Sequence, residues 1–424
     1  MQPPVRISNP VLRVQWARGP LAGCCRWLLL AVWLPVLSAC MGDSRTQLDD
    51  LGASASTYEW DIPAAVPLPL EPADNPMTEA KFQLGRHLFY DTRLSANGDV
   101  ACSSCHHQEK AFSDGRQFPL GTYGDAHPRN AMSLGNTGWF ANFNWARSDV
   151  TTLENQIRGP LFNATPIPEH GITDSNLESI LQQVRDDTTY QALLVAAFPD
   201  DVDADWNFDE HLIPALASFV RGLTSFDSDF DRYWQGDKSA LSAAAKRGLS
   251  LFASERLECT HCHLDDFTLT DNHMNRTWTY PSTRFHNTGA VAVFQEPNRG
   301  LYESTGNSSH LGQFRTMSLR NIALTAPYSH DGSHATLSDI IDTYSQGGKH
   351  GDYAVDGDMS PGFTLTTDEK ADLLAFLCSL TDLTFIRNPR YGNPWPDAAG
   401  NEIGVAENAE ADPAVNPQCQ VPDL

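Results

Sequence analysis

The stretches "CSSCH" at residues 102–106 and "CTHCH" at residues 259–263 decide the fold of this 424-residue chain. Each places two cysteines about one helical turn apart and a histidine directly after the second cysteine. Two thiols at this spacing can each form a thioether with a vinyl group of haem, and the adjoining imidazole then lies under the iron. We therefore expect two covalent c-type haems, held by Cys102, Cys105 and His106 and by Cys259, Cys262 and His263.

The N-terminus has the pattern of an exported protein. Arginines but no acidic residues occur in residues 1–39, and an apolar run from Trp27 to Leu37 leads into Cys40. The run is too short to span a bilayer, so we expect a lipoprotein signal peptide over residues 1–39 and a lipid on Cys40. A secreted protein without a lipid is the alternative. The sequence thus predicts a periplasmic protein anchored to the outer membrane.

The net charge limits the choice of partners. The chain carries a formal charge of -24 at pH 7, and removal of the arginine-containing signal peptide makes it more negative. Nucleic acid is therefore an unsuitable partner. The acidic surface serves solubility or steers a basic protein partner. Residues 40–75, which contain many Ser, Asp, Ala and Pro residues, are predicted to be a tether.

Other uses of paired cysteines fit the two motifs less well. Zinc usually needs further paired ligands, which the sequence does not offer at suitable spacing, and a disulfide within a motif is the remaining alternative. Cys378 and Cys419 lie outside the motifs. In an oxidising compartment we expect them to form a disulfide that clamps the C-terminal tail, with free thiols as the alternative.

The chain also contains an internal duplication. Gly85 and Phe89 precede the first motif, and Gly248 and Phe252 precede the second at the same four-residue interval. After each motif, a pattern of Phe, Leu and Thr begins 113 residues beyond the histidine; these patterns start at Phe219 and Phe376. Equal offsets indicate two copies of one fold.

The duplicated fold is predicted to be mainly α-helical. A capping box at Thr366 and Glu369 precedes leucines at helical spacing, namely Leu373, Leu374, Leu377 and Leu380. We expect two cytochrome c-like helical modules over residues 76–235 and 236–390, followed by a tail over residues 391–424. Little in the sequence requires a sheet beyond short hairpins.

From residue 76 to about residue 390 the sequence resembles the MauG-like branch of the bacterial di-haem cytochrome c peroxidases. The resemblance rests on five stretches in matching order: "ACSSCHHQEKAFSDGR" at 101–116, "HPRNAMSLGN" at 127–136, "LENQIRGPLF" at 153–162, "RGLYESTGN" at 299–307 and "FRTMSLRNIALTAPYSHDGS" at 314–333. It is nearest to the MbnH-type subgroup, which is linked to a copper-associated periplasmic protein. The family implies a peroxide-dependent oxidoreductase.

The resemblance changes the interpretation of Tyr344. Ordinary family members bind the second haem iron through a methionine fourteen residues after the histidine of a "PYxHxG" turn, and the same count from His330 reaches Tyr344. Thr336 is placed to cap this helix, and one face carries Leu337, Ile340, Ile341 and Tyr344. The pattern alone would make Tyr344 a core residue. Similarity to MauG-like proteins implies an axial ligand instead, and a hard oxygen donor favours higher oxidation states of iron.

The first haem is expected to have an open sixth coordination position. Family members often carry a distal histidine about sixteen residues after the first motif, and Thr122 occupies that position here. His107 is too close to His106 in sequence to reach the opposite face of the haem. His127 is expected to pack beside the Asn130 loop rather than to bind iron.

The peroxide-binding pocket is expected to come from residues 153–171. By resemblance, Gln156 and Pro160 line it, and Glu169 is the acid and base that moves a proton between the two peroxide oxygens. The alternative for Glu169 is a solvated loop carboxylate, and His170 is a possible substitute.

Two further features follow from the resemblance. Trp145 matches a tryptophan that relays electrons between the haems, although a buried core tryptophan is the default interpretation. A calcium ion is implied at the module interface, with Asn130, Thr325 and Pro327 as its oxygen ligands.

The sequence therefore predicts an enzyme that uses hydrogen peroxide at haem 1 and shares two oxidising equivalents between both haems. By resemblance, it then oxidises a tryptophan of a periplasmic partner protein, converting it to kynurenine. Two alternatives remain open at this point. One is a conventional cytochrome c peroxidase that takes electrons from a small redox protein, and the other is a di-haem electron carrier without enzymatic activity.

Overall fold

The computed structural model describes residues 57–201, 205–263, 269–270, 285–351, 354–396 and 416–419. The expected signal peptide, Cys40 and the first part of the expected tether lie outside these ranges. Within them, every helix is too short or too polar to cross a membrane.

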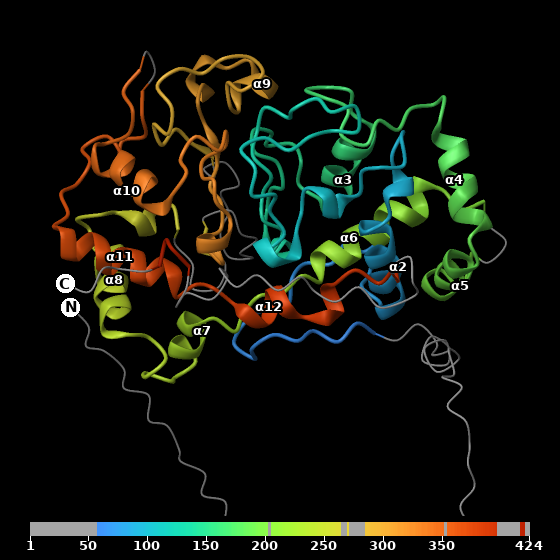
Figure 1. Cartoon of the computed structure of the whole chain (residues 1–424), viewed down its shortest axis with the longest axis horizontal. Helices are drawn as coiled ribbons and strands as arrows, with labels where there is room; N and C mark the ends of the chain where they lie inside the picture. The colour runs from blue at the N-terminus through green and yellow to red at the C-terminus, as the bar shows by residue number, and fades with distance from the viewer. Residues whose placement is uncertain are drawn as a thin grey trace, which may run out of the picture. The chain divides into compact units, whose positions relative to one another are not determined.

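Helices dominate both halves of the chain (Figure 1). The first half contains α2 (Glu79–Phe89), α3 (Leu153–Phe162), α4 (Leu177–Asp186), α5 (Thr188–Ala197), α6 (Ile213–Arg221) and α7 (Asp229–Trp234). The second half contains α8 (Ala243–Phe252), α9 (Tyr302–Thr305), α10 (Leu337–Ser345), α11 (Thr367–Cys378) and α12 (Leu383–Arg387). Two short strands, β1 (Phe285–His286) and β2 (Phe314–Arg315), pair antiparallel with Phe285 opposite Arg315. The prediction of a mainly helical fold is confirmed.

Each half is organised around one crossing pair of helices. In the first half α2 packs against α6, and in the second α8 packs against α11. A Cβ atom at Gly85 would overlap the backbone carbonyl of Ala215, and one at Gly248 would overlap that of Asp372. Only glycine lets the two backbones approach this closely. The four-residue Gly-to-Phe interval found in the sequence therefore marks the same helix crossing in both copies.

The phenylalanines of the duplicated pattern lie directly behind the two motif histidines. The ring centroids of Phe89 and Phe219 are 5.0 Å apart, and those of Phe252 and Phe376 are also 5.0 Å apart. Phe89 lies 6.5 Å from the His106 ring, and Phe252 lies 6.3 Å from the His263 ring. These separations are typical of aromatic contacts. The two copies thus hold their motifs through the same packing.

The apolar core forms two clusters that do not follow the chain order strictly. Phe230, which precedes the expected boundary at residue 236, packs in the cluster of the second half. Phe385 of α12 packs in the cluster of the first half, 5.5 Å from the ring of Phe112. The side-chain amide of Gln108 also donates to the backbone oxygen of Asn388 at 2.8 Å. The division into residues 76–235 and 236–390 remains a prediction; α12 lies in the second range but packs against the core of the first half.

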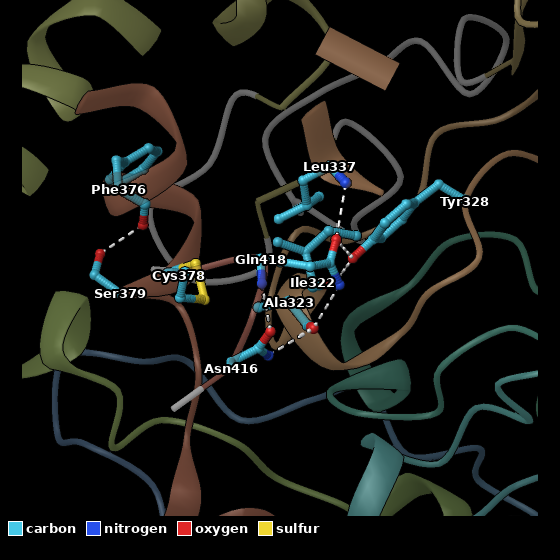
Figure 2. Close-up of a disulfide and its surroundings, with 10 residues drawn as sticks. Ile322, Ala323, Tyr328, Leu337, Phe376, Cys378, Ser379, Asn416 and Gln418 are labelled. Atoms are coloured by element: carbon cyan, nitrogen blue, oxygen red, sulfur yellow. Dashed lines mark hydrogen bonds between the residues drawn. A yellow bond between two sulfur atoms is a disulfide. The ribbon is translucent and has the colours of Figure 1, made fainter. Parts of the chain in front are cut away.

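A disulfide joins Cys378, at the end of α11, to Cys419 in the C-terminal segment. Figure 2 shows this bond beside the Asn416 and Gln418 side chains. The expected clamp on the tail is therefore present, and the free-thiol alternative for these two cysteines is wrong.

Candidate haem sites

Both motifs form a short turn that presents its histidine into a cavity. In the first, the His106 backbone N–H donates to the Cys102 oxygen at 3.0 Å. In the second, the His263 N–H donates to the Cys259 oxygen at the same distance. The four motif cysteines form no disulfide, so the disulfide alternative for the motifs is wrong.

Hydrogen bonds to backbone oxygens orient both motif imidazoles. Nδ1 of His106 donates to the Phe112 oxygen at 2.7 Å, and Nδ1 of His263 donates to the Leu269 oxygen at 2.9 Å. A carbonyl oxygen can only accept, so each ring carries its proton on Nδ1. In the neutral ring Nε2 is then unprotonated and suited to binding a metal. Each histidine is therefore prepared as an axial ligand.

Each motif lines a mainly apolar cavity of a size suited to a large planar cofactor. The first has a volume of ≈ 940 Å³ and the second a volume of ≈ 1380 Å³, both including space open to solvent. Pockets of several hundred Å³ are typical of cofactor sites. Two thiols and one unprotonated imidazole nitrogen on the wall of each cavity are the donor set of a c-type haem. The haem would supply the redox chemistry at each site.

The first cavity contains the residues expected around peroxide. Gln156, Pro160 and Glu169 lie in its wall together with His106. Burial raises the pKa of Glu169 to about 7. A carboxyl group with this pKa exchanges a proton readily near neutral pH, as a general acid or base must.

Thr122 has a structural role near this cavity. Its backbone N–H donates to the backbone oxygen of Glu169 at 2.8 Å, while its hydroxyl donates to the Asp99 carboxylate at 3.0 Å. It is not among the residues that line the cavity. Because the Thr122 backbone N–H bonds to the backbone oxygen of Glu169, this threonine helps to anchor the Glu169 loop.

Two other histidines lie in the wall of the first cavity. His170 is buried, and its Nδ1 donates to the Leu94 oxygen at 2.8 Å. Nδ1 of His127 hydrogen-bonds to the backbone of Arg129, as expected for packing beside the Asn130 loop, but the ring also lines the cavity. Burial lowers the pKa of both imidazoles, so both are neutral bases near pH 7. Sequence reasoning did not foresee His127 in this wall.

Tyr344 lies in the wall of the second cavity, on α10. The N-cap of α10 is Thr336, which accepts from the Asp339 backbone N–H at 3.1 Å. Leu337, Ile340, Ile341 and Tyr344 all line the cavity, as the helical spacing predicts. Burial raises the pKa of the Tyr344 phenol to about 12, and a hydrogen bond with Thr288 opposes this increase. The phenol thus faces the same space as the His263 imidazole.

Sequence reasoning missed two other donors in this wall. His286 and Met359 both line the second cavity. Nδ1 of His286 lies 3.0 Å from the Asp356 carboxylate. Neither residue belongs to a recognisable motif. β1 and the segment near residue 359 reach the cavity only through the tertiary fold, so no local sequence pattern pointed to these donors. Met359 offers a thioether as an alternative to the Tyr344 phenol.

Trp145 belongs to the first half of the chain but lines the cavity of the second half. Its indole N–H donates to the backbone oxygen of Asn130 at 2.9 Å. The backbone N–H of Asn130 in turn donates to the backbone oxygen of His330 at 2.8 Å. These bonds tie the two halves together beside the second cavity. Thr325 and Pro327 lie on the segment that leads to His330, and calcium ligation by Asn130, Thr325 and Pro327 remains a prediction.

Comparisons with known proteins place the chain in a family. A family model described as di-haem cytochrome c peroxidase matches residues 79–239. Cytochrome-c peroxidase IdrP1 of Denitromonas iodatirespirans is 33% identical over 350 residues, which cover 78% of this chain and 89% of that protein. The methylamine utilization protein MauG of Methylophilus methylotrophus is 32% identical over 319 residues, covering 75% and 86% of the two chains.

One similar crystal structure is that of a MauG-like protein associated with microbial copper homeostasis. It is 46% identical, with a TM-score of 0.73, and the match covers 80% of this chain and 99% of that one. The chain therefore belongs to the di-haem cytochrome c peroxidase family, in its MauG-like branch. It is an oxidoreductase of that family, and the family implies two c-type haems and hydrogen peroxide as oxidant. The prediction of an enzyme is confirmed, and the alternative of an electron carrier without enzymatic activity is set aside.

Proposed function

We propose that this enzyme uses hydrogen peroxide at the N-terminal haem site to oxidise a tryptophan of a partner protein at a distance. Glu169 takes a proton from one peroxide oxygen and returns it to the other, while Gln156 and Pro160 shape the pocket. His106 holds the first haem and His263 the second.

The single observation that carries this proposal is the Tyr344 phenol in the same cavity as His263. A phenol oxygen is a harder donor than a thioether and stabilises iron in higher oxidation states. Tyr344 as an axial ligand would let the C-terminal site retain oxidising equivalents. A conventional donor haem gives electrons away instead.

Trp145 supports transfer of electrons between the two sites. An indole is among the most easily oxidised side chains, and that of Trp145 is fixed by its bond to Asn130 at 2.9 Å. Trp145 lies on a segment of the first half and lines the cavity of the second half, a position suited to passing electrons between the two sites. We propose that electrons pass between the sites through Trp145.

The chemistry on the partner balances with two molecules of peroxide. Two H2O2 convert one tryptophan to N-formylkynurenine and two water molecules, and hydrolysis then releases formate and leaves kynurenine. The partner's indole ring is oxidised and the peroxide is reduced. The similar MauG-like protein associated with copper homeostasis supports an exported, copper-associated protein as the partner.

We also propose that the enzyme works in the periplasm as an outer-membrane lipoprotein. The signal-peptide pattern ending at Cys40 supports this location, and Cys40 lies outside the described residues. The lipid would hold the enzyme at the membrane surface.

Two matched variants test the ligand on which the proposal depends. Tyr344→Phe should convert the C-terminal haem of the ferric holoprotein from low-spin to high-spin in absorption and electron paramagnetic resonance spectra. Met359→Leu removes the rival donor from the same cavity and should leave the spectra unchanged. The opposite pair of results would contradict the proposal.

The reaction itself is tested with the enzyme and a co-purified partner. Peroxide should produce kynurenine in the partner, detected by peptide mass spectrometry, and Tyr344→Met should retain both haems but lose this product. A partner that remains unmodified with the wild-type enzyme would count decisively against protein oxidation.

A conventional peroxidase that takes electrons from a small redox protein is the second candidate. Met359 in the wall of the second cavity favours it, as does similarity to a protein named cytochrome-c peroxidase. Rapid peroxide turnover with reduced cytochrome c or a small copper protein, together with a spectrum that depends on Met359, would establish this function.

A further inference from the structure

The C-terminal segment reaches the helix that carries Tyr344. The Cys378–Cys419 disulfide fixes this segment to the end of α11. The side-chain oxygen of Gln418, the neighbouring residue, accepts from the Leu337 backbone N–H at 2.8 Å and from the Tyr328 hydroxyl at 3.1 Å. Figure 2 shows these contacts converging on the Gln418 amide.

The bond to Leu337 completes the N-terminus of α10. Leu337 is the first residue of this helix, so its N–H has no acceptor within the helix. The Thr336 hydroxyl accepts from the backbone N–H of Asp339, and the Gln418 side chain accepts from the backbone N–H of Leu337. The start of α10 is therefore held partly by a residue far away in sequence.

The Gln418 amide is itself fixed from the other side. Its Nε2 donates to the Ala323 oxygen at 3.3 Å, and the buried Asn416 side chain donates to the same oxygen at 3.2 Å. Asn416 Oδ1 also accepts from the Gln418 backbone N–H at 3.0 Å. This network leaves the amide little freedom to rotate.

We propose that Gln418 is a positioning residue for Tyr344. The disulfide holds Gln418 in place, and Gln418 holds the N-terminus of α10 so that the Tyr344 phenol keeps its direction into the C-terminal haem site. This inference rests on the proposed ligand role of Tyr344.

Variants of Gln418 separate positioning from general stabilisation. Gln418→Leu keeps the approximate size of the side chain but removes the oxygen that accepts from Leu337 and Tyr328 and the N–H that donates to Ala323, and should raise the high-spin fraction of the ferric C-terminal haem. Hydrogen exchange of backbone amides 337–344 should also become faster. Gln418→Glu loses the bond to Ala323 but keeps the acceptor oxygen for Leu337, and its charge is favoured at a helix N-terminus, so its spectrum should stay close to that of the wild type. The double variant Cys378→Ser/Cys419→Ser should behave like Gln418→Leu.

Thr366→Ala is the matched control, because it removes the N-cap of α11, a helix that carries no proposed iron ligand. It should lower thermal stability without changing the spectrum. If Gln418→Leu lowers stability in the same way and also leaves the spectrum unchanged, while Tyr344→Phe changes it, the positioning role is overturned. If Tyr344→Phe leaves the spectrum unchanged, the proposed function fails, and this inference fails with it.

A second feature is independent of Tyr344. Trp234, at the end of α7, is 53% exposed and stacks on Phe230 with ring centroids 5.9 Å apart. Phe230 lies 5.8 Å from Phe376, which lies 5.0 Å from Phe252. Phe252 lies 6.3 Å from the His263 ring. Packed rings thus connect an exposed indole to a haem-binding histidine.

We infer that Trp234 donates electrons to the C-terminal haem site when peroxide is supplied without a partner protein. Its indole loses two electrons and two protons and takes an oxygen atom from water, which gives hydroxytryptophan. One H2O2 accepts the two electrons and two protons and becomes two water molecules. The phenylalanine rings are not oxidised themselves; they fill the space between the donor, Trp234, and the acceptor, the C-terminal haem site. Tryptophan is the side chain that is easily oxidised.

Peptide mass spectrometry of the holoprotein after peroxide treatment tests this inference. Trp234 should gain one oxygen atom, and Phe230→Leu, which keeps an apolar side chain but breaks the ring contacts, should reduce this modification several-fold. Equal oxidation of Trp234 in Phe230→Leu would indicate direct attack by peroxide and overturn the inference. Oxidation of other tryptophans with Trp234 unmodified would also overturn it.

Discussion

Glu169→Gln is the substitution that most directly tests the peroxide site. Burial raises the pKa of Glu169 to about 7, and a carboxyl group must be ionised to accept a proton from peroxide. With that pKa, about one tenth of the carboxyl groups are ionised at pH 6 and about nine tenths at pH 8. The rate of the peroxide reaction should therefore rise roughly ninefold over this range.

Glutamine keeps the shape of the side chain but cannot exchange the proton. The rate of Glu169→Gln should fall by roughly 10²–10⁴-fold, and its pH profile should become nearly flat. Stopped-flow spectrophotometry of the holoprotein measures both quantities. Glu178→Gln, at an exposed position on α4, should retain the wild-type rate and profile and serves as the control.

Two results would refute the reasoning for Glu169. One is a Glu169→Gln variant with the wild-type rate and profile. The other is a wild-type rate that rises with a midpoint below pH 6.5 and is lost in His170→Gln. Burial lowers the pKa of His170, so that second result would assign the proton transfer to the imidazole.

Three further predictions concern the scaffold. Gly248→Ala should lower the free energy of unfolding by roughly 1–3 kcal/mol in denaturant titration, because its Cβ would overlap the α11 backbone, whereas Gly357→Ala, with open space around it, should change it little. Asp231→Asn weakens the buried pair with Arg320, where Nη2 and Oδ1 are 2.8 Å apart, and should cost roughly 3–5 kcal/mol in the same assay. If Asn130 binds calcium, chelation should lower the melting temperature of the wild type reversibly and that of Asn130→Ala hardly at all; equal responses would exclude this ligand.

The local sequence was sufficient to predict features whose residues lie close together in the chain. A thioether-forming pair and its histidine occupy five consecutive residues, so the covalent geometry of the backbone brings them together without help from the fold. Helical periodicity alone also places Tyr344 on one face with Leu337 and Ile341, but only the family resemblance pointed to this tyrosine as an iron ligand. The capping residue Thr336 was likewise recognisable from its type and position.

Contacts between segments far apart in the chain could not be predicted from the local sequence. His286 and Met359 line the second cavity from segments without a recognisable motif. Gln418 meets Leu337 across 81 residues of sequence. Such contacts depend on how packed helices and loops close in three dimensions, and no local period encodes them. The position of α12 in the first core was missed for the same reason.

The amino-acid sequence by itself determined the two haem-attachment motifs, the duplication and the helix that carries Tyr344. The motifs and the helix depend on residues within a few turns of one another, and the duplication on equal spacings along the chain. Only the tertiary structure decided which side chains share a cavity, that Trp145 from the first half lies against the second cavity, and that the C-terminal segment supports α10. The physical reason is that the burial which raises the pKa of Glu169 and encloses Tyr344 exists only after distant segments have packed together.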